Sequence, residues 1–169
     1  MMAGTAHALA FDYARYQVAD LDTLLAQSRP RSGADLYPAL PFRLRVTLVS
    51  YAEGCRTEFV KRSMIIADIP KEQVDALAIT RCIKVRSPKG TELRVFIQDE
   101  VAAFLPKEVP LGSSLTLYAI HLFTKAEGPG LLVNEFSTSA GNGPADQRAE
   151  GTSCGCGSPD LSSWHRYLA

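Results

Sequence analysis

Alternating apolar and polar residues predict strands through the middle of the chain. In residues 42–51 the buried candidates are Leu44, Val46 and Leu48, and the positions between them are polar. A period of two is typical of a strand that buries one face. The same reasoning predicts further strands at residues 59–69, 81–87, 91–98, 113–125 and 131–137. The strand at residues 113–125 is apolar on both faces, so we expect it to be buried.

Three short helices are predicted at residues 19–28, 70–79 and 99–109. Asp20 is suited to cap the first helix, Pro70 to begin the second and Pro106 to end the third. Residues 29–41 contain three prolines and a glycine and are expected to be irregular, and residues 52–58 are expected to form a turn. Residues 9–18 fit either a strand or a helix.

The order of these elements predicts a mainly β fold with short helices. Many short strands separated by Gly and Pro turns are typical of a small barrel or a sandwich. A helix between the third and fourth strands resembles the oligonucleotide/oligosaccharide-binding (OB) fold. In this comparison residues 42–51 are the long first strand, residues 81–136 hold the last four strands, and residues 59–79 are an insertion. The prediction is a small Greek-key barrel that resembles the OB fold.

Composition divides the chain into four parts. Residues 1–41 are an N-terminal preface with a short helix, and residues 42–136 are the predicted β-barrel domain. Residues 137–157 are rich in Gly and Ser and have almost no apolar side chain, which predicts a flexible linker. Residues 158–169 predict a short amphipathic helix.

This C-terminal helix offers one docking face, made of Leu161, Trp164, His165 and Leu168 at positions i, i+3, i+4 and i+7. A helix this short is not stable alone in water, so its apolar face is expected to dock. The face fits either the chain's own barrel or a groove on another molecule. It therefore predicts a protein partner or self-association through the tail.

Charge is balanced over the whole chain but not along it. The sequence has 18 Lys and Arg against 18 Asp and Glu, which argues against binding nucleic acid by bulk charge. Residues 43–94 hold 11 basic against 6 acidic side chains, a local excess of five positive charges. An electrostatic function is therefore expected in the first half of the predicted barrel.

A basic face with aromatic rings is the main candidate binding site. If the hairpin at residues 81–98 pairs beside the first strand, one outer face collects Arg43, Arg45, Tyr51, Lys84, Arg86, Arg94, Phe96 and Gln98. Cations that meet phosphates, interleaved with rings that stack on bases, are typical of proteins that bind single-stranded nucleic acid. The alternatives are a solvated outer face or a protein or polyanionic partner.

The sequence carries no recognised catalytic motif. It has no HExxH, Walker, GxSxG or dinucleotide-binding pattern, so we expect a non-enzymatic protein without a cofactor. Of the three histidines, His121 is expected to be a hydrogen-bonded core residue. Cys154 and Cys156 form a CxC pair that could bind a soft metal, with His165 as a third ligand. Binding of single-stranded nucleic acid is the leading prediction. A protein-assembly or adaptor module that uses the barrel and the C-terminal helix is the alternative, and thiol or metal handling is a distant third.

The predicted location is cytoplasmic. The N-terminal residues have no signal-peptide pattern, and no apolar run approaches the ~18 residues that span a bilayer, so no membrane partner is expected. In that compartment all four cysteines (Cys55, Cys82, Cys154 and Cys156) are expected to be reduced.

Overall fold

The computed structural model describes residues 11–138 of the chain and shows a mainly β fold. The strands of this part are β1 Gln17–Ala19, β2 Ala34–Gly54, β3 Arg81–Arg86, β4 Glu92–Ile97, β5 Ser114–Lys125 and β6 Gly128–Thr138. A 3-10 turn at Tyr13–Arg15 precedes them. The helices are α1 Leu21–Ala26, α2 Glu58–Ile66, α3 Lys71–Ala76, α4 Asp99–Ala102 and α5 Leu105–Glu108.

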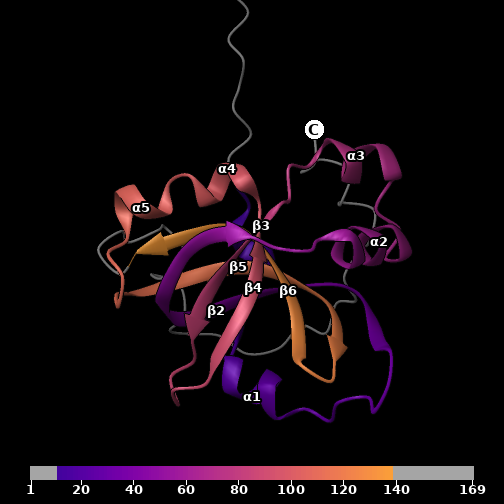
Figure 1. Cartoon of the computed structure of the whole chain (residues 1–169), viewed down its shortest axis with the longest axis horizontal. Coiled ribbons are helices and arrows are strands. Elements are labelled where there is room, and N and C mark those ends of the chain that lie inside the picture. Colours follow the sequence, from indigo (N-terminus) through magenta and orange to yellow (C-terminus); the bar gives the residue numbers. More distant parts are fainter. Residues whose placement is uncertain (1–10, 139–169) are drawn as a thin grey trace, which may run out of the picture.

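The six described strands form one sheet that curves into a ring (Figure 1). Their order is β1-β2-β3-β4-β6-β5, and β2 additionally pairs with β5, which closes the ring. The pairs β2–β3, β3–β4, β2–β5 and β5–β6 are antiparallel, whereas β1–β2 and β4–β6 are parallel. The length of β2, which spans 21 residues, lets one strand reach both β3 and β5.

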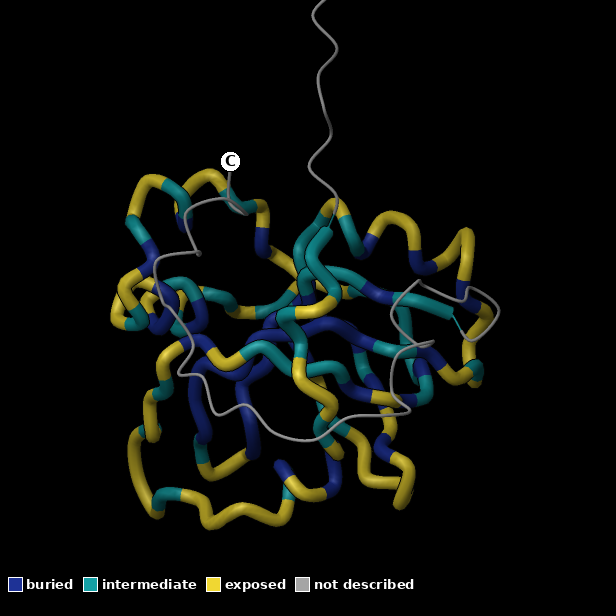
Figure 2. Tube along the Cα trace, turned by 180° about the vertical axis from the view of Figure 1, so that it is seen from behind, coloured by how far each residue is buried: buried dark blue, intermediate teal, exposed yellow. Residues whose placement is uncertain are grey.

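The main hydrophobic core lies inside this ring. The predicted inward set is confirmed, since Leu44, Val46 and Leu48 of β2 are buried together with apolar residues of the other strands. Helix α1 lies at one end of the ring and α4 and α5 lie at the other (Figure 1). Leu21 of α1 and Leu105 of α5 belong to the same core. Figure 2 shows buried residues concentrated in the strands and exposed ones on the outer turns of the helices.

A second core lies between the outer face of the sheet and the pair α2–α3. Val60 and Met64 of α2 and Val74 of α3 pack there against β-sheet residues such as Leu122 and Leu132. His121 is buried on β5, as predicted, with its Nε2 2.9 Å from the carbonyl oxygen of Phe123. The two helices therefore cover part of the ring from outside rather than filling its interior.

The strand predicted at residues 59–69 is wrong, because these residues form helix α2 and the loop after it. The buried side chains Val60, Ser63 and Met64 follow the i, i+3, i+4 spacing of a helix face. Glu58 in the first turn suits the positive end of the helix. The apolar run at residues 64–66 fits both a helical and a strand period, and it misled the sequence analysis.

Three boundaries also differ from prediction. Strand β2 begins at Ala34, so much of the segment expected to be irregular is a strand, with a register shift between Leu36 and Leu40 that accommodates Pro38. Strand β2 also continues to Gly54, which shortens the predicted turn at residues 52–58. The single helix expected at residues 99–109 is two helices, and Pro106 lies in the first turn of α5 instead of ending a helix.

Asp22 ties α1 to the β3–β4 turn, and we expect its loss to be costly. Its side chain is 8% exposed, and its carboxylate accepts hydrogen bonds from Ser87 Oγ at 2.6 Å and the Lys89 backbone N–H at 3.0 Å. Asp22→Ala leaves two donors without an acceptor and should lower the free energy of unfolding by about 2 kcal/mol. Urea denaturation measures this. Asp35→Ala, at an exposed site on β2, is the control; equal losses for both variants contradict the assignment.

Candidate functional site

A concave pocket of about 950 Å³ opens on the outer face of β3 and β4. We call it the outer pocket. Cys82, Arg94 and Phe96 line it from the sheet. One wall comes from the start of α2 and the residues before it, and the other comes from the β5–β6 connection. These walls include Arg56, Phe59, Arg62, Phe123, Lys125 and Gly130.

Three phenylalanine side chains line the outer pocket: Phe59 and Phe96 are half-buried, and Phe123 is buried beneath them at 4% exposure. Phe59 meets Phe123 edge to face, with 4.7 Å between the ring centroids, and Phe96 lies 6.3 Å from Phe123. The Nζ of Lys125 lies 3.4 Å from the centroid of the Phe59 ring, which is a cation–π contact. The outer pocket therefore places the Lys125 ammonium group directly against the Phe59 ring.

The position of Phe123 depends on a glycine in the neighbouring strand. Phe123 of β5 and Gly130 of β6 are paired across the two strands. A Cβ atom at residue 130 would lie 2.2 Å from two carbon atoms of the Phe123 ring. The ring therefore occupies the space that any larger residue at position 130 would need.

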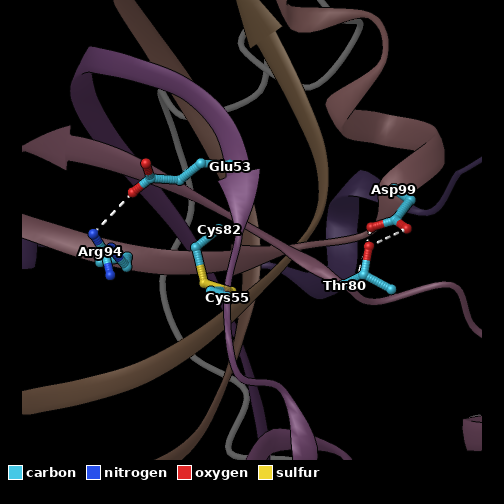
Figure 3. The surroundings of a disulfide bond; sticks show 6 residues. All are labelled: Glu53, Cys55, Thr80, Cys82, Arg94 and Asp99. Atoms are coloured by element: carbon cyan, nitrogen blue, oxygen red, sulfur yellow. Dashed lines mark hydrogen bonds and ion pairs between the residues drawn. A yellow bond between two sulfur atoms is a disulfide. The ribbon is translucent and has the colours of Figure 1, made fainter.

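The basic side chains of the outer pocket differ in whether they have partners. Arg94 forms an ion pair with Glu53, with 2.8 Å between Nη2 and Oε1 (Figure 3). Arg56 and Arg62 are exposed and have no ion pair or hydrogen bond within residues 11–138. These two guanidinium groups are free to meet an anion.

A disulfide between Cys55 and Cys82 lies in the lining of the outer pocket (Figure 3). The prediction that all four cysteines are reduced is therefore wrong for this pair. The end of β2 lies beside the start of β3, which brings the two Cα atoms to 5.8 Å, within reach of a disulfide. Such bonds persist mainly in oxidising environments, so the expectation of reduced cysteines that followed from the predicted cytoplasmic location is not met at this pair.

The chain that leads from α3 into β3 is fixed next to this disulfide. The backbone N–H and the hydroxyl of Thr80 both donate to the Asp99 carboxylate, at 3.0 and 2.7 Å (Figure 3). The Asp99 backbone N–H donates in turn to the carbonyl oxygen of Ala78 at 2.8 Å. These bonds and the disulfide hold both ends of the segment that carries α2 and α3.

The structure divides the predicted basic face. Arg94 and Phe96 line the outer pocket as part of the face of β4. Lys84 and Arg86 point outward from β3 but lie 3.8 and 2.8 Å from the carboxylate of Glu92. The hydrogen bond from Arg86 is the main cause that holds the pKa of Glu92 below its ordinary value. These two cations are therefore partly neutralised.

The other four predicted residues are not among those that line the outer pocket; one of them, Gln98, follows the end of β4. Arg43 and Arg45 occupy the part of β2 that pairs with β5, opposite Tyr118 and Thr116, and they are not among the described residues that line the pocket. Tyr51 packs against the main core, and its hydroxyl donates to the carbonyl oxygen of Val109 at 3.0 Å. Register shifts in β2 after Leu48 change the alternation of its faces, so Tyr51 is half-buried against the core instead of lying beside Arg94 and Phe96.

The sequence analysis missed the residues on α2. Phe59 and Arg62 are three residues apart, a spacing that places both on one side of a helix. Read as a strand, the same segment separates them onto opposite faces. A helical interpretation of residues 58–66 would have placed a ring and a cation together.

Several predicted residues lie outside the part that the structure describes. These are the docking residues Leu161, Trp164, His165 and Leu168 and the candidate metal ligands Cys154 and Cys156. Within residues 11–138, no group of three or more His, Cys, Asp or Glu side chains is placed to hold a metal ion. No helix in the same range has the length and apolar character needed to cross a membrane.

No match to this chain was found among protein families, curated proteins or solved structures. The function is therefore argued from the geometry of the outer pocket.

Proposed function

We propose that this protein binds single-stranded nucleic acid in the outer pocket, as a binding protein without a catalytic step or a cofactor. The observation that carries the proposal is the combination of two unpartnered guanidinium groups, Arg56 and Arg62, with the half-buried rings of Phe59 and Phe96 in the same pocket. Cations in a groove bind the backbone, and bases stack on aromatic side chains for roughly 1–3 kcal/mol each. Lys125 adds a further cation beside the Phe59 ring.

The connectivity of the ring supports the same proposal. We propose that β2, β3, β4, β5 and β6 are the five strands of an OB-type barrel, with α4 between the third and fourth strands and α2–α3 inserted between the first and second. In that fold the second and third strands and two flanking connections bind oligonucleotides. The outer pocket has the corresponding position, since it lies on β3 and β4 between α2 and the β5–β6 connection.

A second hollow extends the proposed path of the strand. It has a volume of about 560 Å³, and Arg31 and Leu36 contribute to its lining. Phe59, Lys125 and Glu127 line both this hollow and the outer pocket. The two hollows therefore adjoin at these residues, and we propose that a strand occupies both.

Reversing the free charges of the outer pocket tests the proposal. Arg56→Glu combined with Arg62→Glu should weaken binding of a labelled oligothymidylate of about 12 nucleotides at least tenfold. If each arginine meets one phosphate, the dependence of log K on log salt should also become shallower by about 1.4. Fluorescence anisotropy at several salt concentrations measures both effects.

The matched control is Arg43→Glu combined with Arg45→Glu, which reverses the same charge outside the pocket. We expect this control to change affinity less than threefold, and circular dichroism should show that both variants are folded. Equal losses for both pairs would indicate binding by overall charge and not by the pocket. Absence of binding by the wild-type protein to single-stranded DNA and RNA at low salt would refute the proposal and leave the protein-assembly alternative.

A further inference from the structure

A smaller pocket of about 140 Å³ lies where α2 and α3 meet the chain before β1. We call it the inner pocket. It shares no lining residue with the outer pocket. Its apolar lining includes Met64, Ile69, Leu77 and Ile120, and its polar lining includes Asp12, Arg15, Tyr16, Gln98 and Asn134.

The volume of the inner pocket suits one ring. A cavity of about 150 Å³ with apolar walls is large enough to bind benzene. Met64 and Ile69 come from α2 and the loop after it, whereas Ile120 comes from β5, so apolar side chains reach the pocket from both the helical and the sheet side. A flat ligand can therefore be held between helix and sheet.

A chain of hydrogen bonds forms the polar end of the inner pocket. Gln98 Nε2 donates to Asn134 Oδ1 at 2.8 Å, and Asn134 Nδ2 donates to the Tyr16 hydroxyl at 3.0 Å. Burial is the main cause that raises the pKa of Tyr16, so its hydroxyl keeps a proton that it can donate. These hydrogen bonds therefore hold the Gln98, Asn134 and Tyr16 side chains in place relative to one another.

Gln98 is left with hydrogen-bonding capacity that its neighbours do not use. One N–H bonds to Asn134, and neither the second N–H nor Oε1 has a hydrogen-bond partner within residues 11–138. A carboxamide with a free donor and a free acceptor can read the edge of a ring that offers the complementary pair, as glutamine does with adenine.

We propose that the inner pocket binds a small planar cyclic amide, of the size and edge chemistry of a pyrimidine base. Gln98 reads the amide edge of the ring, the Tyr16 hydroxyl donates a further hydrogen bond, and the apolar side chains hold the ring faces. This site is separate from the proposed strand-binding pocket and does not depend on it.

Uracil and 1,3-dimethyluracil provide a matched pair of probes. The two have the same ring, but methylation removes both N–H donors from the amide edges. Titration followed by the backbone and side-chain amide signals in two-dimensional NMR should show uracil binding at least tenfold tighter. Gln98→Leu should remove this preference, because leucine cannot pair with the edge.

Filling the inner pocket tests its location. Leu77→Phe should weaken uracil binding at least tenfold, whereas Leu111→Phe, the same change at an exposed leucine, should have no effect. Both variants should bind a labelled oligodeoxyadenylate, whose bases have no cyclic amide edge, like the wild type, which separates this proposal from the strand-binding one. If Leu77→Phe does not fold, Ile69→Phe serves as the filling variant. Equal binding of the two probes, or unchanged uracil binding in a folded filling variant, would overturn the proposal.

Discussion

Replacing Cys55 with serine should lower the free energy of unfolding by about 3.5 kcal/mol, as expected for loss of a crosslink between residues 27 apart in sequence. The disulfide restricts the unfolded chain and joins the ends of the segment that carries α2 and α3. Without it, the wall of the outer pocket that holds Arg56 and Phe59 is attached less firmly. We therefore also expect weaker oligonucleotide binding. Urea denaturation in the absence of reductant measures the stability.

Reduction of the wild-type protein provides the internal control. A reductant should bring the wild type close to the stability of Cys55→Ser and should leave that variant unchanged. The prediction is contradicted if reductant does not change the free energy of unfolding of the wild type and if Cys55→Ser has that same free energy of unfolding. The Cys55–Cys82 bond would then not stabilise the protein.

The strands were predictable from sequence where one face is buried and the register is regular. The alternation of Ile83 and Val85 with Lys84 and Arg86 predicted β3 correctly. The apolar run around Leu117 correctly predicted β5, a strand that is buried on both faces. In each case the pattern along the chain reflects the environment of a single element.

The elements that failed depend on contacts between distant segments. Helix α2 lies where a strand was predicted, because Val60 and Met64 pack on the outer face of β5 and β6. The sequence pattern of residues 59–69 alone does not show that this surface is there to pack against. The disulfide required knowing that Cys55 and Cys82 are neighbours across β2 and β3, although α2 and α3 separate them in sequence. Tertiary packing decided both outcomes.

The candidate site was predictable only in part for the same reason. Arg94 and Phe96 share a face of β4, so alternation alone placed them together. Phe123, by contrast, belongs to a strand whose two faces are both buried, and nothing in its own segment marks it as part of a pocket. Its role depends on Gly130, the residue paired with it on β6.

Gly130→Ala should therefore impair both stability and binding. The added methyl group would lie 2.2 Å from the Phe123 ring, so the ring must move away from β6 and into the outer pocket. Overpacking of this kind is expected to lower the free energy of unfolding by about 2 kcal/mol. The displaced ring should also weaken oligonucleotide binding at least fivefold. Urea denaturation and fluorescence anisotropy measure the two effects.

Gly54→Ala is the matched control for this prediction. Gly54 also lines the outer pocket, but a Cβ atom there would have no atom within 4 Å. We expect its stability to stay within about 0.5 kcal/mol of the wild type, as for surface substitutions that disturb no contact. If Gly130→Ala is as stable as this control and binds equally well, the ring of Phe123 is not confined by Gly130. If Gly130→Ala loses stability but keeps full affinity, Phe123 supports the fold without shaping the surface formed by Phe59 and Phe96.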